Sequence, residues 1–334
     1  MTLIIGGYEI NEFEDGATFI IADSAITRMT TYKNSTDNEK TTEVKTLLNG
    51  YRKFYAIDLK IKYPKFNNSG FFEKYHKIET YGKCVIAFAG GKDTAHHIIN
   101  SIELSLSNLK IALGDSTSIY LVPMDNKTPQ EINTSYGQCW DVDFYNFRDV
   151  HLLLDKNFIS TLIKGVISES VSSAREYKID EEGIKDLECE FLVSIYCEKT
   201  RRNYLFKYTV TKQMSGDIFV PAVEMREVGR NELVYIGVPE YGNEMIKCHH
   251  EFINSPDFSK LTQCEGIGAD KFEFVENKSI FDFMKIKFID VVKSCSDDNY
   301  KIIDFPVFGL NIDRTKIELE TYTYEDVKSV YIML

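Results

Sequence analysis

The chain has 334 residues, of which 43% are hydrophobic and 27% charged, a composition typical of a globular protein with a sizeable core. Its formal net charge of -12 argues against nucleic acid and anionic membrane surfaces as partners, because both are negatively charged. Its 7 cysteines are irregularly spaced and form no CxxC pair, which argues against a zinc ribbon and favours reduced thiols.

The first residues lack the features of a targeting segment. No basic flank precedes the apolar run from Leu3 to Ile5, and the run is too short for a signal peptide. No stretch of the sequence reaches the length of a membrane span. We therefore expect a cytoplasmic protein.

The chain is expected to begin with two strands. Residues 2–8 and 18–22 are apolar runs, and the polar residues 11–16 between them favour a hairpin. Residues 28–75 contain Thr, Asn and Lys clusters together with Pro64, and we interpret them as an insertion within one domain that spans 1–334.

Regular patterns return after the insertion. Strands are predicted at 77–81 and 84–89, joined by a turn at Gly82 and Lys83 and followed by Gly90 and Gly91. Apolar residues at helical spacing then predict a helix from about Asp93 to Leu109. The remaining predictions are helices at 150–175, 240–254 and 279–295, and strands at 190–197, 204–210, 217–223, 233–237, 301–311 and 317–322. This order predicts an α+β fold in which two stacked sheets lie between helical layers.

Three segments resemble proteasome β subunits and the bacterial HslV-type peptidase, which are N-terminal-nucleophile (Ntn) hydrolases. The segments are Thr2 to Ile5, Ile20 to Thr27, and His76 to Gly91, which includes a strand ending in Gly-Gly before a helix. The resemblance is strongest in the amino-terminal third of the chain. It implies a four-layer αββα sandwich with Thr2 in the position of the nucleophile.

The chemistry of such a site follows from its residue types. A threonine hydroxyl is a weak nucleophile that needs a nearby base, and a free α-amino group titrates at roughly 7.7–8.0. Thr2 therefore supplies both groups once Met1 is removed. The resemblance implies that Lys77 polarises the hydroxyl, that Asp23 orients the lysine, and that the Gly90 backbone N–H stabilises the oxyanion.

The implied function is a threonine-type peptidase or amidohydrolase that works through an acyl-enzyme and without a cofactor. The resemblance further implies a peptide or protein substrate, assembly into a homo-oligomeric ring and an ATPase as a partner. The alternative is a catalytically inactive scaffold or binding protein with the same fold.

Several departures from the family pattern bear on these two alternatives. The insertion separates Asp23 from Lys77 and makes Lys40 and Lys45 competitors of Lys77. Val238 and Pro239 stand where the family has a serine after a glycine. Near the carboxyl end, Ser296, Asp297 and Asp298 are followed by Tyr300 and Lys301 rather than by a Ser-Gly pattern.

Other motifs favour structural interpretations. His96 and His97, and likewise Cys248, His249 and His250, are adjacent in sequence and point in different directions on a helix, so a shared metal ion is not expected. The segment from Gly266 to Gly268 lacks the third glycine of a dinucleotide-binding turn. An unrelated αβ sandwich is a third interpretation, and it predicts that Thr2, Asp23 and Lys77 lie far apart.

Overall fold

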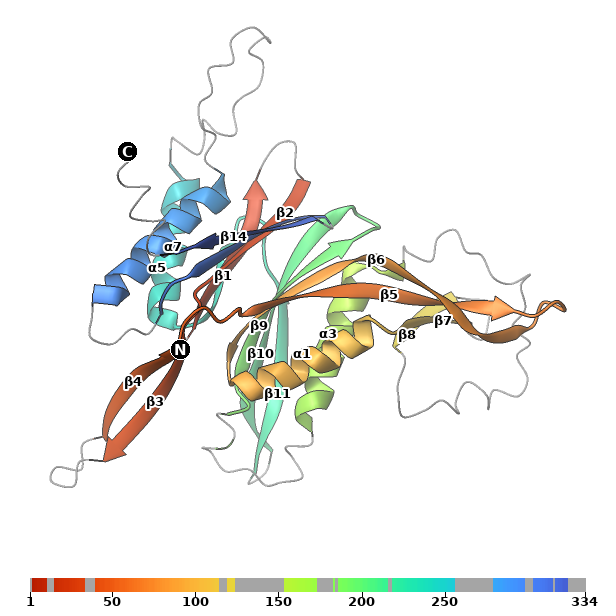
Figure 1. Cartoon of the computed structure of the whole chain (residues 1–334), viewed down its shortest axis with the longest axis horizontal. Helices are drawn as coiled ribbons and strands as arrows, with labels where there is room; N and C mark the ends of the chain where they lie inside the picture. Colours follow the sequence, from red (N-terminus) through yellow and green to blue (C-terminus); the bar gives the residue numbers. More distant parts are fainter. Residues whose placement is uncertain are drawn as a thin grey trace, which may run out of the picture.

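The structure is a computed structural model with a mixed α+β fold (Figure 1). It describes residues 2–10, 15–33, 40–113, 119–123, 153–172, 183, 186–215, 218–255, 279–297, 303–314 and 316–323. Three sheets are present in this part of the chain, with five, seven and two strands.

The five-stranded sheet contains the amino terminus. Its order is β12-β1-β2-β13-β14, and all of its pairings are antiparallel. The strands are β1 (Leu3–Ile10), β2 (Asp15–Ala22), β12 (Val234–Gly237), β13 (Val307–Asp313) and β14 (Lys316–Tyr322). Strand β1 is therefore an interior strand, between its hairpin partner β2 and the edge strand β12, which is distant in sequence.

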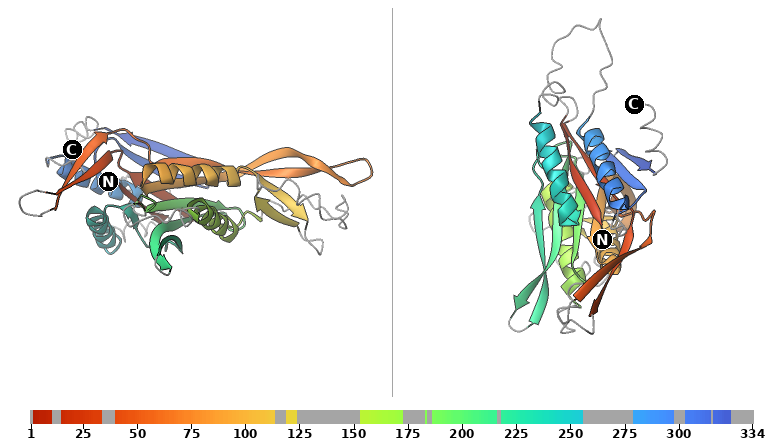
Figure 2. Two further views of the ribbon diagram at one scale, coloured as in Figure 1. Left: turned by 90° about the horizontal axis from the view of Figure 1, so that it is seen from below. Right: turned by 90° about the vertical axis from the view of Figure 1, so that its left-hand side faces the viewer.

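The seven-stranded sheet has the order β11-β10-β9-β6-β5-β7-β8, with a parallel pairing between β5 and β7. Its strands are β5 (Phe54–Phe66), β6 (Phe72–Gly90), β7 (Leu109–Leu113), β8 (Ile119–Pro123), β9 (Cys189–Cys197), β10 (Arg202–Ser215) and β11 (Ile218–Glu227). Strands β5 and β6 extend far beyond the body of the molecule and form an arm together with β7 and β8 (Figures 1 and 2).

The helices cover the outer faces of the two large sheets. Helices α1 (Lys92–Leu106) and α3 (Lys156–Ser172) share one apolar core with the seven-stranded sheet. Helices α5 (Pro239–Ile253) and α7 (Ile280–Asp297) share a second core with the five-stranded sheet. A third core lies between the two sheets, so the sheets pack face to face (Figure 2).

The apolar runs of the sequence reflect burial on both faces of the sheets. Successive side chains of a strand point to opposite faces. In β1, Leu3 and Ile5 therefore pack under the helices, whereas Ile4 packs between the sheets. Strand β6 follows the same rule, with Ile86 toward α1 and Val85 toward the other sheet. Such strands need apolar residues at nearly every position.

Residues 28–75 do not form one inserted unit. Strands β3 (Ile26–Lys33) and β4 (Lys40–Leu48) make a two-stranded sheet that pairs with no other described strand. Strand β5, in contrast, pairs with both β6 and β7 inside the seven-stranded sheet. Only the β3–β4 hairpin therefore matches the predicted insertion.

The predicted turn at Gly82 and Lys83 is wrong. Strand β6 is continuous from Phe72 to Gly90, and Gly82 pairs with Leu59 of β5. The pairing register shifts beside this position, where Thr80 already faces Lys60. The glycine thus belongs to a strand irregularity, which is a common place for glycine in strands.

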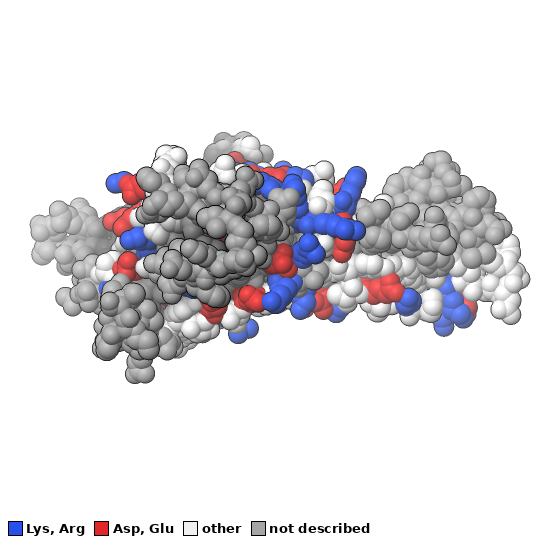
Figure 3. All heavy atoms as spheres, turned by 90° about the horizontal axis from the view of Figure 1, so that it is seen from above, with Lys and Arg blue, Asp and Glu red and all other residues white. Residues whose placement is uncertain are grey.

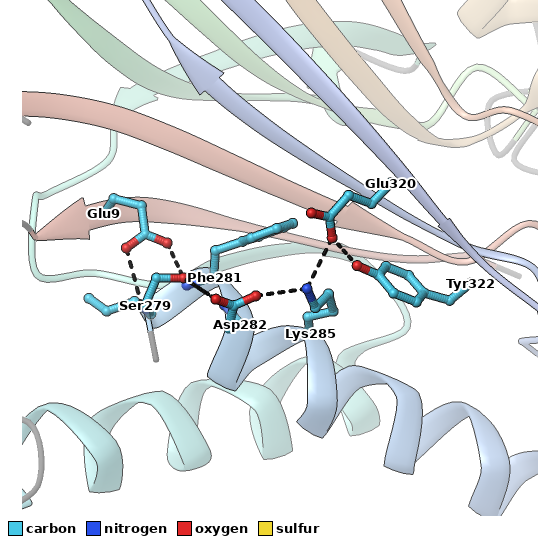
Figure 4. Close-up of polar contacts among 8 residues, drawn as sticks. Glu9, Ser279, Phe281, Asp282, Lys285, Glu320 and Tyr322 are labelled. Carbon is cyan, nitrogen blue, oxygen red and sulfur yellow. Dashed lines mark hydrogen bonds and ion pairs between the residues drawn. The ribbon is translucent and has the colours of Figure 1, made fainter. Parts of the chain in front are cut away.

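Helix α7 begins with a polar cap that connects it to β1 (Figure 4). Ser279 Oγ accepts a hydrogen bond from the Asp282 backbone N–H at 3.0 Å and donates one to the Asp282 carboxylate at 3.0 Å, so its side chain caps the first turn of the helix. The buried carboxylate of Glu9 accepts hydrogen bonds from the Ile280 and Phe281 backbone N–H groups at 3.2 and 2.6 Å. These are the free donors of a helix amino terminus, and Glu9 therefore fixes α7 to the sheet.

Two further properties concern the molecule as a whole. Among the described residues, no helix is both long and apolar enough to cross a membrane. On the face shown in Figure 3, basic and acidic side chains of the described residues are interspersed.

Candidate active site

Thr2 lies directly before β1, where its backbone is held by the end of β12. The Thr2 carbonyl accepts a hydrogen bond from the Val238 N–H at 2.8 Å, and Leu3 pairs with Gly237. A Cβ added to Gly237 would lie 1.8 Å from the Thr2 oxygen, and Gly237 has a φ of +97°. Only glycine fits this close approach without displacing Thr2.

Asp23 follows the last residue of β2 and lies beside the start of β1. Its carboxylate accepts hydrogen bonds from the Leu3 N–H at 2.8 Å and from the Ala25 N–H at 2.9 Å. The Asp23 N–H donates in turn to the Leu3 carbonyl at 3.1 Å. The side chain is fully buried, one residue away from Thr2 along β1.

Lys53 is the partner of Asp23. Its Nζ lies 2.9 Å from each Asp23 carboxylate oxygen, and its side chain is only 3% exposed. Burial lowers the pKa of the Lys53 ammonium, and the negative charge of Asp23 opposes this shift. A buried lysine with a lowered pKa is suited to polarise a neighbouring hydroxyl and to handle protons.

The prediction that Lys77 occupies this place is wrong. Lys77 lies on the β6 arm, is 58% exposed and forms an ion pair with Glu79. Its ammonium also lies over the Tyr63 ring. The competitors Lys40 and Lys45 belong to β4, and their side chains lie outside the described residues.

The sequence does not single out Lys53, because the pattern of residues 28–75 predicts an insertion outside the core. The lysine precedes β5, which had been assigned to the insertion, whereas β5 is a core strand of the large sheet. The available signal was a charged residue directly before the apolar run that starts at Phe54.

Gly90 ends β6 near the same point. Its φ of +109° is one that glycine adopts at little cost, and an added Cβ would lie 2.5 Å from the Glu188 carbonyl oxygen. The preceding residue, Ala89, has its Cβ 3.5 Å from the position of a Cβ on Gly237. The end of β6 therefore comes close to Gly237, and Gly237 touches Thr2.

The two other segments whose sequences depart from the proteasome-like pattern lie at the start of α5 and at the end of α7. Helix α5 starts at Pro239, and Val238 at its amino terminus provides no side-chain cap. Ser296 and Asp297 fall at the end of α7, with side chains outside the described residues, as is all of Asp298.

A second ion pair, which the sequence analysis did not single out, lies behind Gly237. Glu190 of β9 and Lys207 of β10 are 2.6 Å apart and are 26% and 19% exposed. Glu190 also accepts a hydrogen bond from the Gly237 N–H at 2.8 Å. Lys207 donates to the Tyr235 carbonyl at 3.0 Å.

An aromatic cluster lies on the helix side of Lys53. The Tyr51 and Tyr55 hydroxyls both contact His96 Nε2, the latter at 3.0 Å, and Phe88 packs edge-on against the His96 ring. The Phe88 N–H donates to the Lys53 carbonyl at 3.1 Å, which joins the cluster to the ion pair. His96 Nε2 is thus engaged by two phenol hydroxyls.

No group of three or more His, Cys, Asp or Glu side chains is placed to hold a metal ion in the described part of the chain. An open hollow of about 570 Å³ lies at the start of β5, next to Tyr51 and Tyr55 of the aromatic cluster. Its lining residues are Gly50, Tyr51, Arg52, Phe54, Tyr55, Ala56, Val85, Leu310 and Ile317.

Comparison with models of known protein families finds no match, and comparison with curated proteins finds none either. Any functional conclusion must therefore come from the geometry around Thr2.

Proposed function

We propose that the chain is an Ntn hydrolase with the four-layer αββα sandwich of proteasome subunits, and that Thr2 cleaves peptide or amide bonds. Two face-to-face sheets between α1 with α3 and α5 with α7 support the fold part of this proposal. The position of Thr2 at the start of the interior strand β1 supports the functional part.

The buried pair of Asp23 and Lys53 is the observation that carries the proposal. Removing two charges from water costs several kcal/mol per ion, which the pair only partly recovers. Asp23 is also bonded to the Leu3 N–H at 2.8 Å, so the pair is built against the residue next to Thr2. A buried ion pair with a lowered lysine pKa, placed beside the start of β1, supports a functional role for this site.

The proposed reaction uses each of these groups. With Met1 removed, the Thr2 α-amine accepts the hydroxyl proton while Oγ attacks the substrate carbonyl. Lys53 polarises the hydroxyl, Asp23 holds the ammonium in place, and the Gly90 N–H donates to the oxyanion. The amine then protonates the leaving group, and water hydrolyses the resulting ester to restore Thr2.

The aromatic cluster would contact the substrate beside the cleaved bond. Tyr51, Tyr55 and His96 are partly exposed and pack around the buried ring of Phe88, whose N–H is bonded to the Lys53 carbonyl. A site of this kind favours an apolar or aromatic substrate side chain. Assembly into a homo-oligomeric ring and cooperation with an ATPase belong to the proposal through the family resemblance alone.

The test is covalent labelling of the chain produced with Thr2 as its first residue. An epoxyketone that reacts with both the hydroxyl and the α-amine of an amino-terminal threonine should add one inhibitor mass, as measured by intact mass spectrometry. Thr2→Ala and a chain that retains Met1 are the controls, and neither should react.

A non-catalytic scaffold of the same fold is the second candidate. Val238 and Pro239 favour it, because neither side chain offers the hydroxyl that the family places beside the α-amine. Absence of any adduct on the chain that starts at Thr2 would contradict the hydrolase proposal and support the scaffold.

A further inference from the structure

The ion pair of Glu190 and Lys207 holds the last residues of β12 from the opposite sheet. Leu192 and Leu205 pack between the sheets, so Glu190 and Lys207, each two residues away on the same strands, point to that side as well. Glu190 binds the Gly237 N–H at 2.8 Å, and Lys207 binds the Tyr235 carbonyl at 3.0 Å. Two backbone groups of β12 are thus fixed by one pair of charged side chains.

Any movement of this part of β12 reaches Thr2 directly. The Val238 N–H donates to the Thr2 carbonyl at 2.8 Å. A Cβ on Gly237 would lie 1.8 Å from the same oxygen, so the two backbones are already in close contact. A shift of Gly237 toward β1 would displace the Thr2 backbone. A shift of Gly237 away from β1 would lengthen the hydrogen bond between the Val238 N–H and the Thr2 carbonyl.

The Glu190–Lys207 pair also lies next to the turn at Val238, where few side-chain hydrogen bonds hold the backbone. Val238 supplies only a backbone N–H at this turn, and it gives α5 no side-chain cap. Holding a reactive group within a fraction of an ångström requires neighbours that are themselves fixed by hydrogen bonds. Glu190 and Lys207 provide such bonds from β9 and β10, two strands of a different sheet.

We propose that Glu190 and Lys207 are positioning residues for Thr2, acting through Gly237 and Val238 rather than by contact with substrate. This inference rests on the proposed function, because it assigns the pair to the nucleophile of that site. It predicts that loss of the pair slows the chemical step more than it weakens the binding of substrate or inhibitor.

The experiment compares epoxyketone labelling kinetics of chains that begin at Thr2. Glu190→Ala should lower the maximal labelling rate by about tenfold or more, with the half-saturating inhibitor concentration nearly unchanged, since a shift of about 1 Å can cost roughly 10²-fold in rate. Glu190→Gln keeps an acceptor for the Gly237 N–H and should restore most of the rate. Lys207→Met, which releases the Tyr235 carbonyl, should fall between these two variants.

Glu227→Gln is the matched control. Glu227 pairs with Lys156 at 2.7 Å and joins β11 to α3, so its loss should leave the labelling rate within about twofold of the wild type, as expected for an exposed ion pair.

Thermal unfolding shows whether each variant is folded. If Glu190→Ala does not fold, the labelling rate of Lys207→Met tests the positioning role in its place. If the wild type is labelled and all variants of Glu190 and Lys207 are labelled at the same rate, the positioning role is overturned but the proposed function is not. No labelling of the wild type would overturn the proposed function and this inference with it.

Discussion

Protonation of Glu9 should have a measurable effect on stability. Its carboxylate is 5% exposed and holds the amino terminus of α7, with Asp282 nearby (Figure 4). Burial raises the pKa of Glu9 from 4.5 to about 7, although hydrogen bonds from Phe281 and Ile280 oppose the shift. The folded state therefore binds this proton more tightly than the unfolded state.

The sign of the resulting pH dependence follows from linkage. The stabilising effect of the protonated group is fully present below pH 4.5 and is lost as the pH rises to about 7. At about 1.36 kcal/mol per pKa unit, the loss is on the order of 3 kcal/mol. Burial also lowers the pKa of His249, to about 4, which makes stability rise with pH in the wild type and in Glu9→Gln alike. Urea unfolding between pH 4.5 and 8 should therefore show the Glu9 decline in the difference between the free energies of unfolding of the two proteins. Parallel curves for the two proteins would contradict the assignment.

At the level of single residues, the sequence predicted the positions of Asp23 and Gly90 at strand ends but not the partner lysine. Asp23 follows an apolar run, and Gly90 closes another, so both could be placed from local pattern. Lys53 and Lys77 both adjoin runs of strand character, and sequence alone does not say which is buried. Burial of Lys53 depends on strand pairings between segments that are distant along the chain.

At the level of elements, β5 and the β3–β4 hairpin differ in what they contribute. Residues 28–75 contain many polar residues around one apolar segment, Phe54 to Ile61, and that segment belongs to β5, which carries Leu59 and Ile61 into the core under α1. The hairpin pairs with no other strand among the described residues. Pairing between β5 and β7, which is parallel and non-local, is the feature that local pattern does not reveal.

This difference can be tested with two variants from the same predicted insertion. Ile61→Ala should lower the free energy of unfolding by about 2–5 kcal/mol, because Ile61 is fully buried. Replacing residues 30–43 by Asn-Gly keeps the pairing of Met29 with Val44 and should change the free energy by less than about 1 kcal/mol. Chemical denaturation measures both values, and a larger loss from the shortened hairpin would show that it supports the core.

At the level of the whole molecule, the order of strands and helices predicts an α+β fold, and the mixed α+β composition with two large sheets is confirmed. Continuous apolar runs, such as β1 and β9, carried that prediction because they indicate strands that are buried on both faces. The arm of β5 and β6 and the neighbouring positions of β1 and β12 were not predicted, since both depend on long-range pairings. Convergence of Asp23, Lys53 and Gly237 on the start of β1 is a product of those pairings.

The most direct test of this account compares two lysines in chains that begin at Thr2. Lys53→Met removes the buried partner of Asp23, whereas Lys77→Met removes an exposed lysine on the arm. Breaking a buried ion pair costs about 3–5 kcal/mol, so labelling of each variant is measured below its own melting temperature. The double variant Asp23→Asn, Lys53→Met removes both charges and serves as the alternative if Lys53→Met does not fold. We predict that the epoxyketone adduct forms on Lys77→Met as on the wild type and is lost in both Lys53 variants. Equal adduct formation in all of these proteins would contradict the assignment of Asp23 and Lys53 to a Thr2 active site.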